Sequence, residues 1–201
     1  MNKKQMRKDI LAIRDSISKE DILKKSEIIL NKVKATDIFK NSKNIMLFTS
    51  FGSEVYTHDF IVWCKREDKN IVLPYIDKST DTMKISVFNS FDDMKAGYKG
   101  ILEVKEECIQ SFDEKKVELI ITPCVCYDFN KYRIGYGKGF YDRFFAKTPN
   151  AFKIGICFDE CLVDSIEYDE YDVKTDMVIT DKRVITIFGA GGDRDHDKRP
   201  K

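Results

Sequence analysis

The sequence has no excess of either charge and contains little histidine. Its 201 residues include 35 Lys and Arg against 34 Asp and Glu, a net charge of +1, and only two histidines. Nucleic acids and anionic membranes attract domains with a basic excess, so neither is an expected partner. No run approaches the roughly 18 apolar residues that a membrane span needs. The basic start Met1-Asn2-Lys3-Lys4 lacks the apolar segment of a signal peptide, so we expect a soluble, cytoplasmic protein.

The six cysteines lack the spacing of a metal site. None of them forms a C-x-x-C pair, and Cys124 and Cys126 lie in an apolar run. Structural zinc sites usually show closely paired ligands, so zinc is not expected. A chain of this length does not depend on disulfides either. We expect reduced thiols, several of them in the core.

Apolar patterning predicts a single domain over residues 1–188. Helices are predicted at 3–16, 18–33, 58–67 and 140–147, and strands at 44–49, 71–76, 83–88, 117–127, 152–158, 177–180 and 184–188. Strands that alternate with helices indicate an α/β fold, a three-layer α/β/α sandwich with a mostly parallel sheet. Pro123 should end or bulge its strand, because proline cannot donate to a ladder. Residues 189–201 have no apolar residue after Ala190 and predict a disordered tail. The oligomeric state is not specified by sequence, and a monomer is expected.

Two helix starts carry capping residues, and the first helix has two distinct faces. Ser18 and Thr57 are the predicted caps of the second and third helices. The apolar stripe of the first helix consists of Met6, Ile10, Ile13 and Ile17, and its basic face consists of Lys3, Arg7 and Arg14. At roughly 100° per residue the basic residues share one side. Such a face is typically solvated, and an anion-facing edge is the alternative.

The segment 133–143 predicts a phosphate site. Gly135, Gly137 and Gly139 alternate after the strongest apolar strand and before a helix. Glycines let a backbone approach a ligand closely, and a helix N-terminus presents free N–H groups to phosphate. Charged side chains accompany the glycines, namely Arg133, Lys138, Asp142 and Arg143. The segment is neither a Walker loop nor a G-x-G-x-x-G dinucleotide motif, and a flexible surface loop is the alternative.

The stretch from Pro123 to Arg143 resembles the signature of the 5-formyltetrahydrofolate cyclo-ligase family, also called methenyltetrahydrofolate synthetases. It contains an apolar strand ending in proline, the pair Tyr127-Asp128, and the segment Arg133-Ile-Gly-Tyr-Gly-Lys-Gly-Phe-Tyr-Asp142. The resemblance extends over about residues 3–181. It implies the same three-layer α/β fold. It also implies ATP- and Mg²⁺-dependent conversion of 5-formyltetrahydrofolate to 5,10-methenyltetrahydrofolate, with release of ADP and phosphate through a phosphorylated formyl intermediate.

The resemblance also implies roles for particular residues. The expected ATP-binding residues are Lys3, Lys4, Arg7, Arg133, Ile134, Gly135, Tyr136, Gly137, Lys138, Gly139, Phe140 and Tyr141. The expected folate-binding residues are Phe51, Glu54, Tyr56, Tyr136, Gly137, Lys138, Gly139 and Phe140. Arg133, Lys138 and Asp142 are the expected catalytic residues, and Asp142 with Asp176 the expected ligands of Mg²⁺. No protein nucleophile is needed, because phosphoryl transfer depends on positioning and electrostatic stabilisation.

Two departures from the family pattern leave alternatives open. Tyr56 stands where an acidic residue that contacts folate is often found, and Phe51 replaces a frequent methionine. The same scaffold with another small acid as substrate is therefore one alternative. A nucleotide- or RNA-binding protein without catalysis is the other, supported by the basic helix face and the loop aromatics. The balanced charge argues against that second alternative, and Asp142 and Asp176 favour catalysis.

Overall fold

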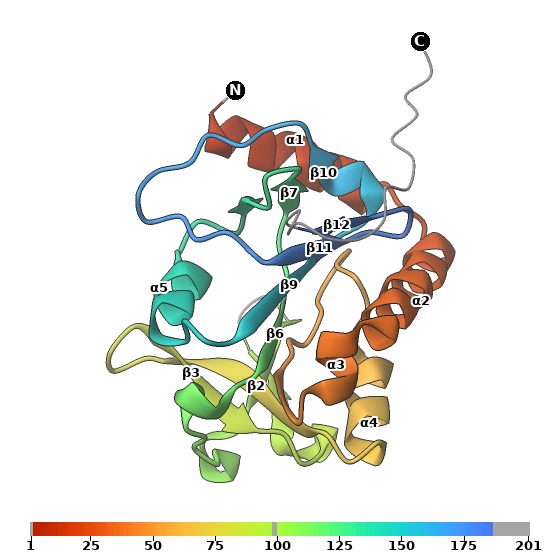
Figure 1. Ribbon diagram of the computed structural model, residues 1–201. Helices are drawn as coiled ribbons and strands as arrows, with labels where there is room; N and C mark the ends of the chain where they lie inside the picture. Colours follow the sequence, from red (N-terminus) through yellow and green to blue (C-terminus); the bar gives the residue numbers. More distant parts are fainter. Residues whose placement is uncertain (1, 98–99, 187–201) are drawn as a thin grey trace.

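A computed structural model describes residues 2–97 and 100–186, and Figure 1 shows their arrangement. The predicted tail at 189–201 and residues 187–188 of the predicted last strand lie outside these ranges. No helix within them is long and apolar enough to cross a lipid bilayer.

The helices begin close to the predicted positions. The α-helices of the described residues are α1 (Lys3–Asp15), α2 (Lys19–Ala35), α3 (Asp37–Asn41), α4 (His58–Arg66) and α5 (Phe140–Lys147). Short 3-10 helices lie at Phe91–Asp93, Glu106–Cys108, Glu114–Lys116 and Asp159–Cys161. The Ser18 hydroxyl accepts the backbone N–H of Asp21, which confirms the predicted cap of α2.

The central sheet has seven strands in the order β12-β11-β9-β6-β1-β2-β3. Its strands are β1 (Asn44–Met46), β2 (Asn70–Asp77), β3 (Thr82–Val87), β6 (Leu119–Thr122), β9 (Phe152–Ile156), β11 (Met177–Ile179) and β12 (Val184–Thr186). The five inner strands pair in parallel, whereas the edge strands β3 and β12 pair antiparallel. The predicted α/β fold with a mostly parallel sheet is therefore confirmed.

Residue alternation along the inner strands divides the core between the two faces of the sheet. Ile45 of β1, Ile71 of β2 and Leu119 of β6 belong to the larger core cluster, which also contains buried side chains of α2, α3 and α4. Their neighbours Val72 and Ile120 belong to the second cluster, together with side chains of α5. Successive strand side chains point to opposite faces, so β1, β2 and β6 each contribute to both cores. Figure 1 shows α2, α3 and α4 on one side of the sheet and α5 on the other.

The apolar run 117–127 is not one strand. β6 ends at Thr122, Pro123 follows, and the chain then forms the hairpin of β7 (Cys126–Asp128) and β8 (Arg133–Ile134). This hairpin joins β10 (Leu162–Val163) in a three-stranded sheet, and β4 (Met94–Ala96) pairs with β5 (Leu102–Val104) in a two-stranded one. The sequence suggests that the Gly-rich loop follows the central strand directly, but in the structure it follows β8. The buried Asp128 favours this route, because its carboxylate closes the hairpin turn by accepting the N–H of Tyr132 at 2.9 Å.

Two further details differ from expectation. Thr57 precedes α4, but its hydroxyl makes no capping bond; it donates instead to the carbonyl of Phe48 at 2.6 Å. Ile13 is 44% exposed, so it is not part of the buried stripe of α1. The buried side of α1 contains Ile10 and, next to it, the charged Arg14. Tertiary contacts to the 124–136 region explain that burial and are described below.

Candidate active site

A pocket lies beyond the carboxyl ends of the parallel strands. Phe48 follows β1, Cys124 follows β6 and Cys157 follows β9, and all three line it. The chain passes from β1 to β2 on one side and later returns to β6 on the other side of β1. Ligands of open α/β sheets bind at such a switch in strand order. The pocket is narrow, with an internal volume of about 10 Å³, room for about one water molecule. A larger ligand therefore requires the surrounding loops to move.

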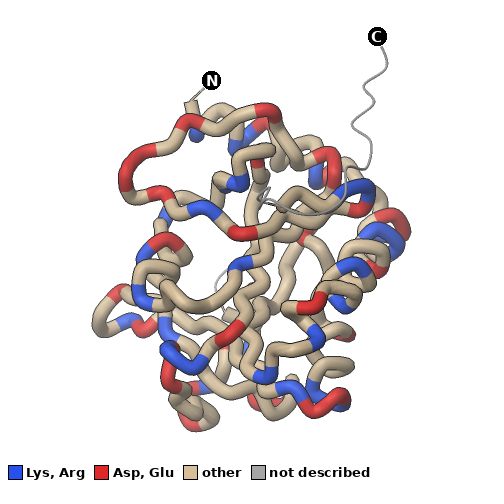
Figure 2. Tube along the Cα trace, in the orientation of Figure 1, with Lys and Arg blue, Asp and Glu red and all other residues tan. Residues whose placement is uncertain are grey.

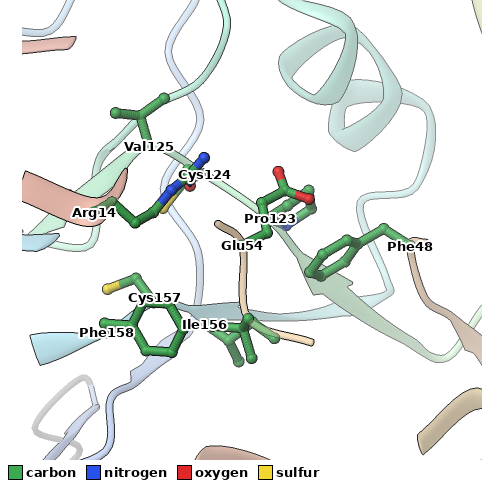
Figure 3. A pocket seen from close by; sticks show the side chains of 10 residues that line it. Arg14, Phe48, Glu54, Pro123, Cys124, Val125, Ile156, Cys157 and Phe158 are labelled. Carbon is green, nitrogen blue, oxygen red and sulfur yellow. The ribbon is translucent and has the colours of Figure 1, made fainter. Parts of the chain in front are cut away.

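Arg14 of α1 enters this pocket and connects three parts of the chain. Figure 3 shows it beside Glu54 and Cys124. Its Nε donates to Ser53 Oγ at 3.0 Å, and its Nη1 donates to the Cys124 carbonyl at 3.0 Å. Its Nη2 donates to the Tyr136 hydroxyl at 2.9 Å. Three of the five guanidinium N–H groups thus have protein acceptors, although the residue is only 5% exposed.

Glu54 is the buried carboxylate of the pocket. The Tyr136 hydroxyl donates to its Oε1 at 2.8 Å, and the backbone N–H of Phe51 donates to its Oε2 at 3.1 Å. Burial raises the pKa of Glu54 to about 6, while these two hydrogen bonds and the charge of Arg14 lower it. A pKa of about 6 makes the Glu54 carboxyl change charge in the mildly acidic range, and the residue lines the pocket.

The Gly-rich loop is fixed to α1 by Arg7. The Arg7 Nε donates to the carbonyl of Gly135 at 2.7 Å. Gly137 and Gly139 have φ angles of +94° and +64°, which side chains rarely adopt, and Gly139 is the N-cap of α5. The loop thus ends at the N-terminus of an eight-residue helix, as expected for a phosphate site.

Arg133 and Asp142 form an internal ion pair. The Arg133 Nη2 donates to Asp142 Oδ1 at 2.7 Å, and its Nη1 donates to the Val173 carbonyl at 2.7 Å. The Val173 N–H also donates to Asp142 Oδ1, at 3.1 Å. Arg133 is 8% exposed and lies over the ring of Phe145. Two of its five guanidinium N–H groups are therefore engaged inside the protein.

The two predicted metal residues have different partners. Asp176 Oδ2 accepts the backbone N–H of Lys153 at 2.8 Å, at the amino ends of β9 and β11. Asp142 Oδ1 accepts from Arg133 and Val173, and Asp142 Oδ2 has no hydrogen bond within the described part of the chain. In those same ranges no group of three or more His, Cys, Asp or Glu side chains is arranged to hold a metal ion. Mg²⁺ is commonly bound by one or two carboxylates plus phosphates, so a single free carboxylate oxygen is compatible with it.

The remaining predicted residues surround the loop with looser contacts. Lys3 pairs with Asp172, and its Nζ lies 3.7 Å from Asp169. Lys4 and Lys138 are exposed, whereas Phe140 and Tyr141 are half-buried and pack against the smaller core. Ile134 is buried beside the loop.

The predicted folate residues converge with the loop. The rings of Phe51 and Tyr136 lie 5.5 Å apart, and Tyr136 remains 44% exposed. The Tyr56 ring lies 5.1 Å from that of His58, and its hydroxyl contacts Asp59 at 3.4 Å. Segments 51–56 and 135–140, far apart in the sequence, thus touch through Phe51, Tyr136 and Glu54, and Glu54 also lines the pocket.

Buried cysteines lie in and beside the pocket. All six cysteines are unpaired. Cys124 and Cys157 line the pocket, and burial raises the pKa of the Cys124 thiol and raises that of the nearby Cys126 to about 12. A neutral thiol is a poor nucleophile, so Cys124 and Cys126 act as small apolar groups.

Arg14 is the residue that the sequence analysis did not assign to the site. The pattern favoured a solvated basic face, and for Arg14 this interpretation is wrong. Its position seven residues after Arg7, two helical turns along the same face, was the available signal. Charge alone would not have found it, since Figure 2 shows basic and acidic residues interspersed along the trace.

Comparison with known proteins identifies the family. The sequence model described as the 5-formyltetrahydrofolate cyclo-ligase family matches residues 1–181. A probable 5-formyltetrahydrofolate cyclo-ligase of Schizosaccharomyces pombe is 32% identical over 161 residues, covering 73% of this chain and 79% of the relative. A probable cyclo-ligase of Caenorhabditis elegans is 27% identical over 91% of this chain and 94% of its own length. The solved structure of the 5,10-methenyltetrahydrofolate synthetase of Aquifex aeolicus superposes with a TM-score of 0.82, at 25% identity and 98% coverage of both chains. The chain belongs to the 5-formyltetrahydrofolate cyclo-ligase family.

Proposed function

We propose that this protein converts 5-formyltetrahydrofolate to 5,10-methenyltetrahydrofolate with consumption of ATP. The observation that carries the proposal is the meeting of a glycine-rich helix N-terminus with a buried carboxylate, Glu54, at the switch in strand order. The helix N-terminus suits a triphosphate, and the Glu54 carboxylate suits the N–H groups of a pterin ring. Family membership supports the same pairing of ligands.

The triphosphate would bind at the loop 135–139. The free N–H groups at the start of α5 and the exposed Lys138 supply positive charge there. Arg7 supports the loop through Gly135, and Lys3 and Lys4 lie on the same helix. Because Arg133 is paired internally, its proposed role is to orient Asp142 rather than to grip phosphate.

The folate would bind over Phe51 and Tyr136. These rings lie 5.5 Å apart, next to Glu54, and aromatic faces can stack on a heteroaromatic ring. The Glu54 carboxylate can accept hydrogen bonds from the pterin, and Tyr56 would border the rest of the substrate. Opening of the narrow pocket would accompany binding.

The reaction would begin with transfer of the γ-phosphoryl group to the formyl oxygen. That bond formation breaks the bond to ADP and makes the oxygen a good leaving group. The N10 amine then attacks the formyl carbon and loses its proton. Departure of phosphate with the former formyl oxygen leaves the methenyl ring. The protein contributes positioning and electrostatic stabilisation, and no intermediate is covalently attached to it.

Asp142 and Asp176 are the proposed carboxylates for Mg²⁺, with Asp142 Oδ2 the better placed of the two because it is free of hydrogen bonds among the described residues. Bound Mg²⁺ would offset negative charge on the phosphates. Arg133 and the Val173 N–H would keep the Asp142 carboxylate in a fixed orientation.

The test is the absorbance of 5,10-methenyltetrahydrofolate after the protein is mixed with 5-formyltetrahydrofolate, ATP and Mg²⁺. A rise that requires all three additions is expected. No rise, with ATP binding still seen by calorimetry, would refute this substrate and favour another small acid on the same loop. Steeply salt-dependent RNA binding without turnover would favour a binding protein instead.

A further inference from the structure

We propose that Arg14 is a positioning residue of the reaction, which joins the Gly-rich loop to the 51–54 loop so that Tyr136 and Glu54 face the folate together. The inference rests on the proposed function for its kinetic part only. Arg14 touches neither the loop glycines nor any proposed metal carboxylate. It acts through the two side chains that it holds.

The geometry of the guanidinium carries the argument. Its three N–H directions reach Ser53 Oγ at 3.0 Å, the Cys124 carbonyl at 3.0 Å and the Tyr136 hydroxyl at 2.9 Å. One planar group thereby spans a loop after β1, the end of β6 and the Gly-rich loop. A lysine has the charge but not this fixed fork.

The contact with Tyr136 continues to Glu54. The same hydroxyl that accepts from Arg14 donates to Glu54 Oε1 at 2.8 Å. The Tyr136 ring is 44% exposed although its hydroxyl is held inside. Arg14 therefore holds the Tyr136 hydroxyl and, through it, one oxygen of the buried carboxylate.

The charge of Arg14 also bears on the ionisation of Glu54. Arg14 on α1 and Tyr136 on the loop both lower the Glu54 pKa against the effect of burial. Tyr141 on α5 interacts electrostatically with Glu54, and Cys124 and Cys157 line the same pocket. Arg14 is the one cation among these groups, so its removal should favour protonated Glu54.

The first experiment needs no turnover. The Glu54 carboxyl is followed by ¹³C NMR in protein labelled with ¹³C-carboxyl glutamate, and its signal is assigned with Glu54→Gln. The wild-type midpoint is expected near 6, and Arg14→Gln should raise it while Arg14→Lys should leave it closer to wild type. An unchanged midpoint in folded Arg14→Gln would overturn the proposal whether or not the protein is a cyclo-ligase.

The second experiment measures kinetics. In Arg14→Gln the kcat/KM for 5-formyltetrahydrofolate should fall about 10- to 100-fold, as for loss of hydrogen bonds to a charged group. Its inflection with pH should move upward with the Glu54 midpoint, and Arg14→Lys should restore part of the activity. Lys8→Gln, an exposed change on the same helix, is the matched control and should stay within about twofold. An unchanged kcat/KM and pH profile in Arg14→Gln would contradict the proposal while the wild-type activity stands.

Folding is checked by circular dichroism. If Arg14→Gln does not fold, Tyr136→Phe replaces it, since this change keeps the ring and removes only the bridging hydroxyl. It should raise the Glu54 midpoint and lower kcat/KM for the folate. A wild-type midpoint and a wild-type kcat/KM in Tyr136→Phe would overturn the proposal. Absence of turnover by the wild type would refute the proposed cyclo-ligase activity but not the role of Arg14. The NMR titration would still decide whether Arg14 sets the pKa of Glu54.

Discussion

At the residue scale, Glu54 combines a charge with nearly complete burial. It is 5% exposed, and its carboxylate receives the Tyr136 hydroxyl and the Phe51 N–H. Those bonds offset only part of the cost of removing a carboxylate from water. A buried carboxylate of this kind is retained for binding rather than for the stability that it adds. This agrees with the position of Glu54 in the pocket.

The raised pKa of Glu54 predicts a stability change with pH. The folded-state pKa of about 6 exceeds the ordinary value of 4.5. The folded protein therefore binds the proton more tightly, and this contribution to stability is complete below pH 4.5 and lost as pH rises through 6. The free energy of unfolding of the wild type, minus that of Glu54→Gln, should fall by about 2 kcal/mol between pH 4 and pH 7. Urea unfolding at several pH values measures it, and a difference that grows with pH would contradict the assignment.

Asp142 has a structural role beside its proposed catalytic one. Its carboxylate is the ion-pair partner of Arg133, whose side chain is 5% exposed. Removing the carboxylate leaves that guanidinium buried and uncompensated. The Asp142 carboxylate thus compensates the charge of Arg133, and in the proposed function it would also bind Mg²⁺.

Two substitutions at Asp142 should separate these roles. Asp142→Ala should cost about 3 kcal/mol of stability because Arg133 loses its partner. Asp142→Asn keeps the size and an acceptor oxygen, so it should cost about 1 kcal/mol. Both should lower turnover at least about 100-fold. Urea unfolding and the methenyl absorbance measure the two effects, and full turnover by Asp142→Asn would remove the residue from the mechanism.

At the element scale, β9 runs directly beneath the buried ring of Tyr127. A Cβ on Gly155 would clash with that ring, whose hydroxyl donates to the Thr122 carbonyl at 3.2 Å. Tyr127 of β7 thereby packs the small sheet onto the central sheet at the level of the pocket. The absence of a side chain at 155 permits this close approach.

Gly155→Ala should therefore destabilise the protein by about 2 kcal/mol, the usual size for overpacking. The matched control is Gly135→Ala, because a Cβ there meets nothing within 4 Å and its φ is not positive. That control should change stability by less than about 0.5 kcal/mol. Denaturant unfolding compares the two. Equal effects would mean that loss of glycine itself, and not the Tyr127 contact, sets the cost.

At the scale of the whole molecule, the site is assembled from segments that are remote in sequence. Arg7 and Arg14 on α1, Glu54 after β1 and the Gly-rich loop after β8 meet only in the folded chain. A ligand that needs all of them binds the folded state and not the unfolded one. Binding must then raise the melting temperature.

Ligand-dependent melting should separate the two halves of the site. At ligand concentrations about 100 times Kd, the stabilisation is about 2.7 kcal/mol, or roughly 5–10 °C for a chain of this size. Scanning calorimetry should show such a rise with ATP and Mg²⁺, and another with 5-formyltetrahydrofolate. Glu54→Gln should lose the folate shift and keep the nucleotide shift. Loss of both shifts in this variant would place Glu54 at the nucleotide instead.

The sequence by itself determined the class of fold and the chemistry of the loop. Apolar periodicity is local, so it located α1, α2, α4, α5 and the inner strands, and Pro123 marked the end of β6 because proline cannot donate to a ladder. The glycines at 137 and 139 predicted positive φ for the same local reason. The residues predicted to bind ATP, folate and Mg²⁺ stay predictions.

Only the tertiary structure decided which partner each charged side chain contacts. Arg7 and Arg14 look alike in the sequence, yet one holds the loop backbone and the other lies in the pocket. The sequence suggests Arg133 as a phosphate ligand, but its guanidinium donates to the Val173 carbonyl and to Asp142. The β7–β8 hairpin also escaped prediction, because the partners that fix it come from distant segments, such as the N–H of Ile166 that donates to Asp128. Burial and long-range hydrogen bonds set the state of a charged group, and neither is encoded in local spacing.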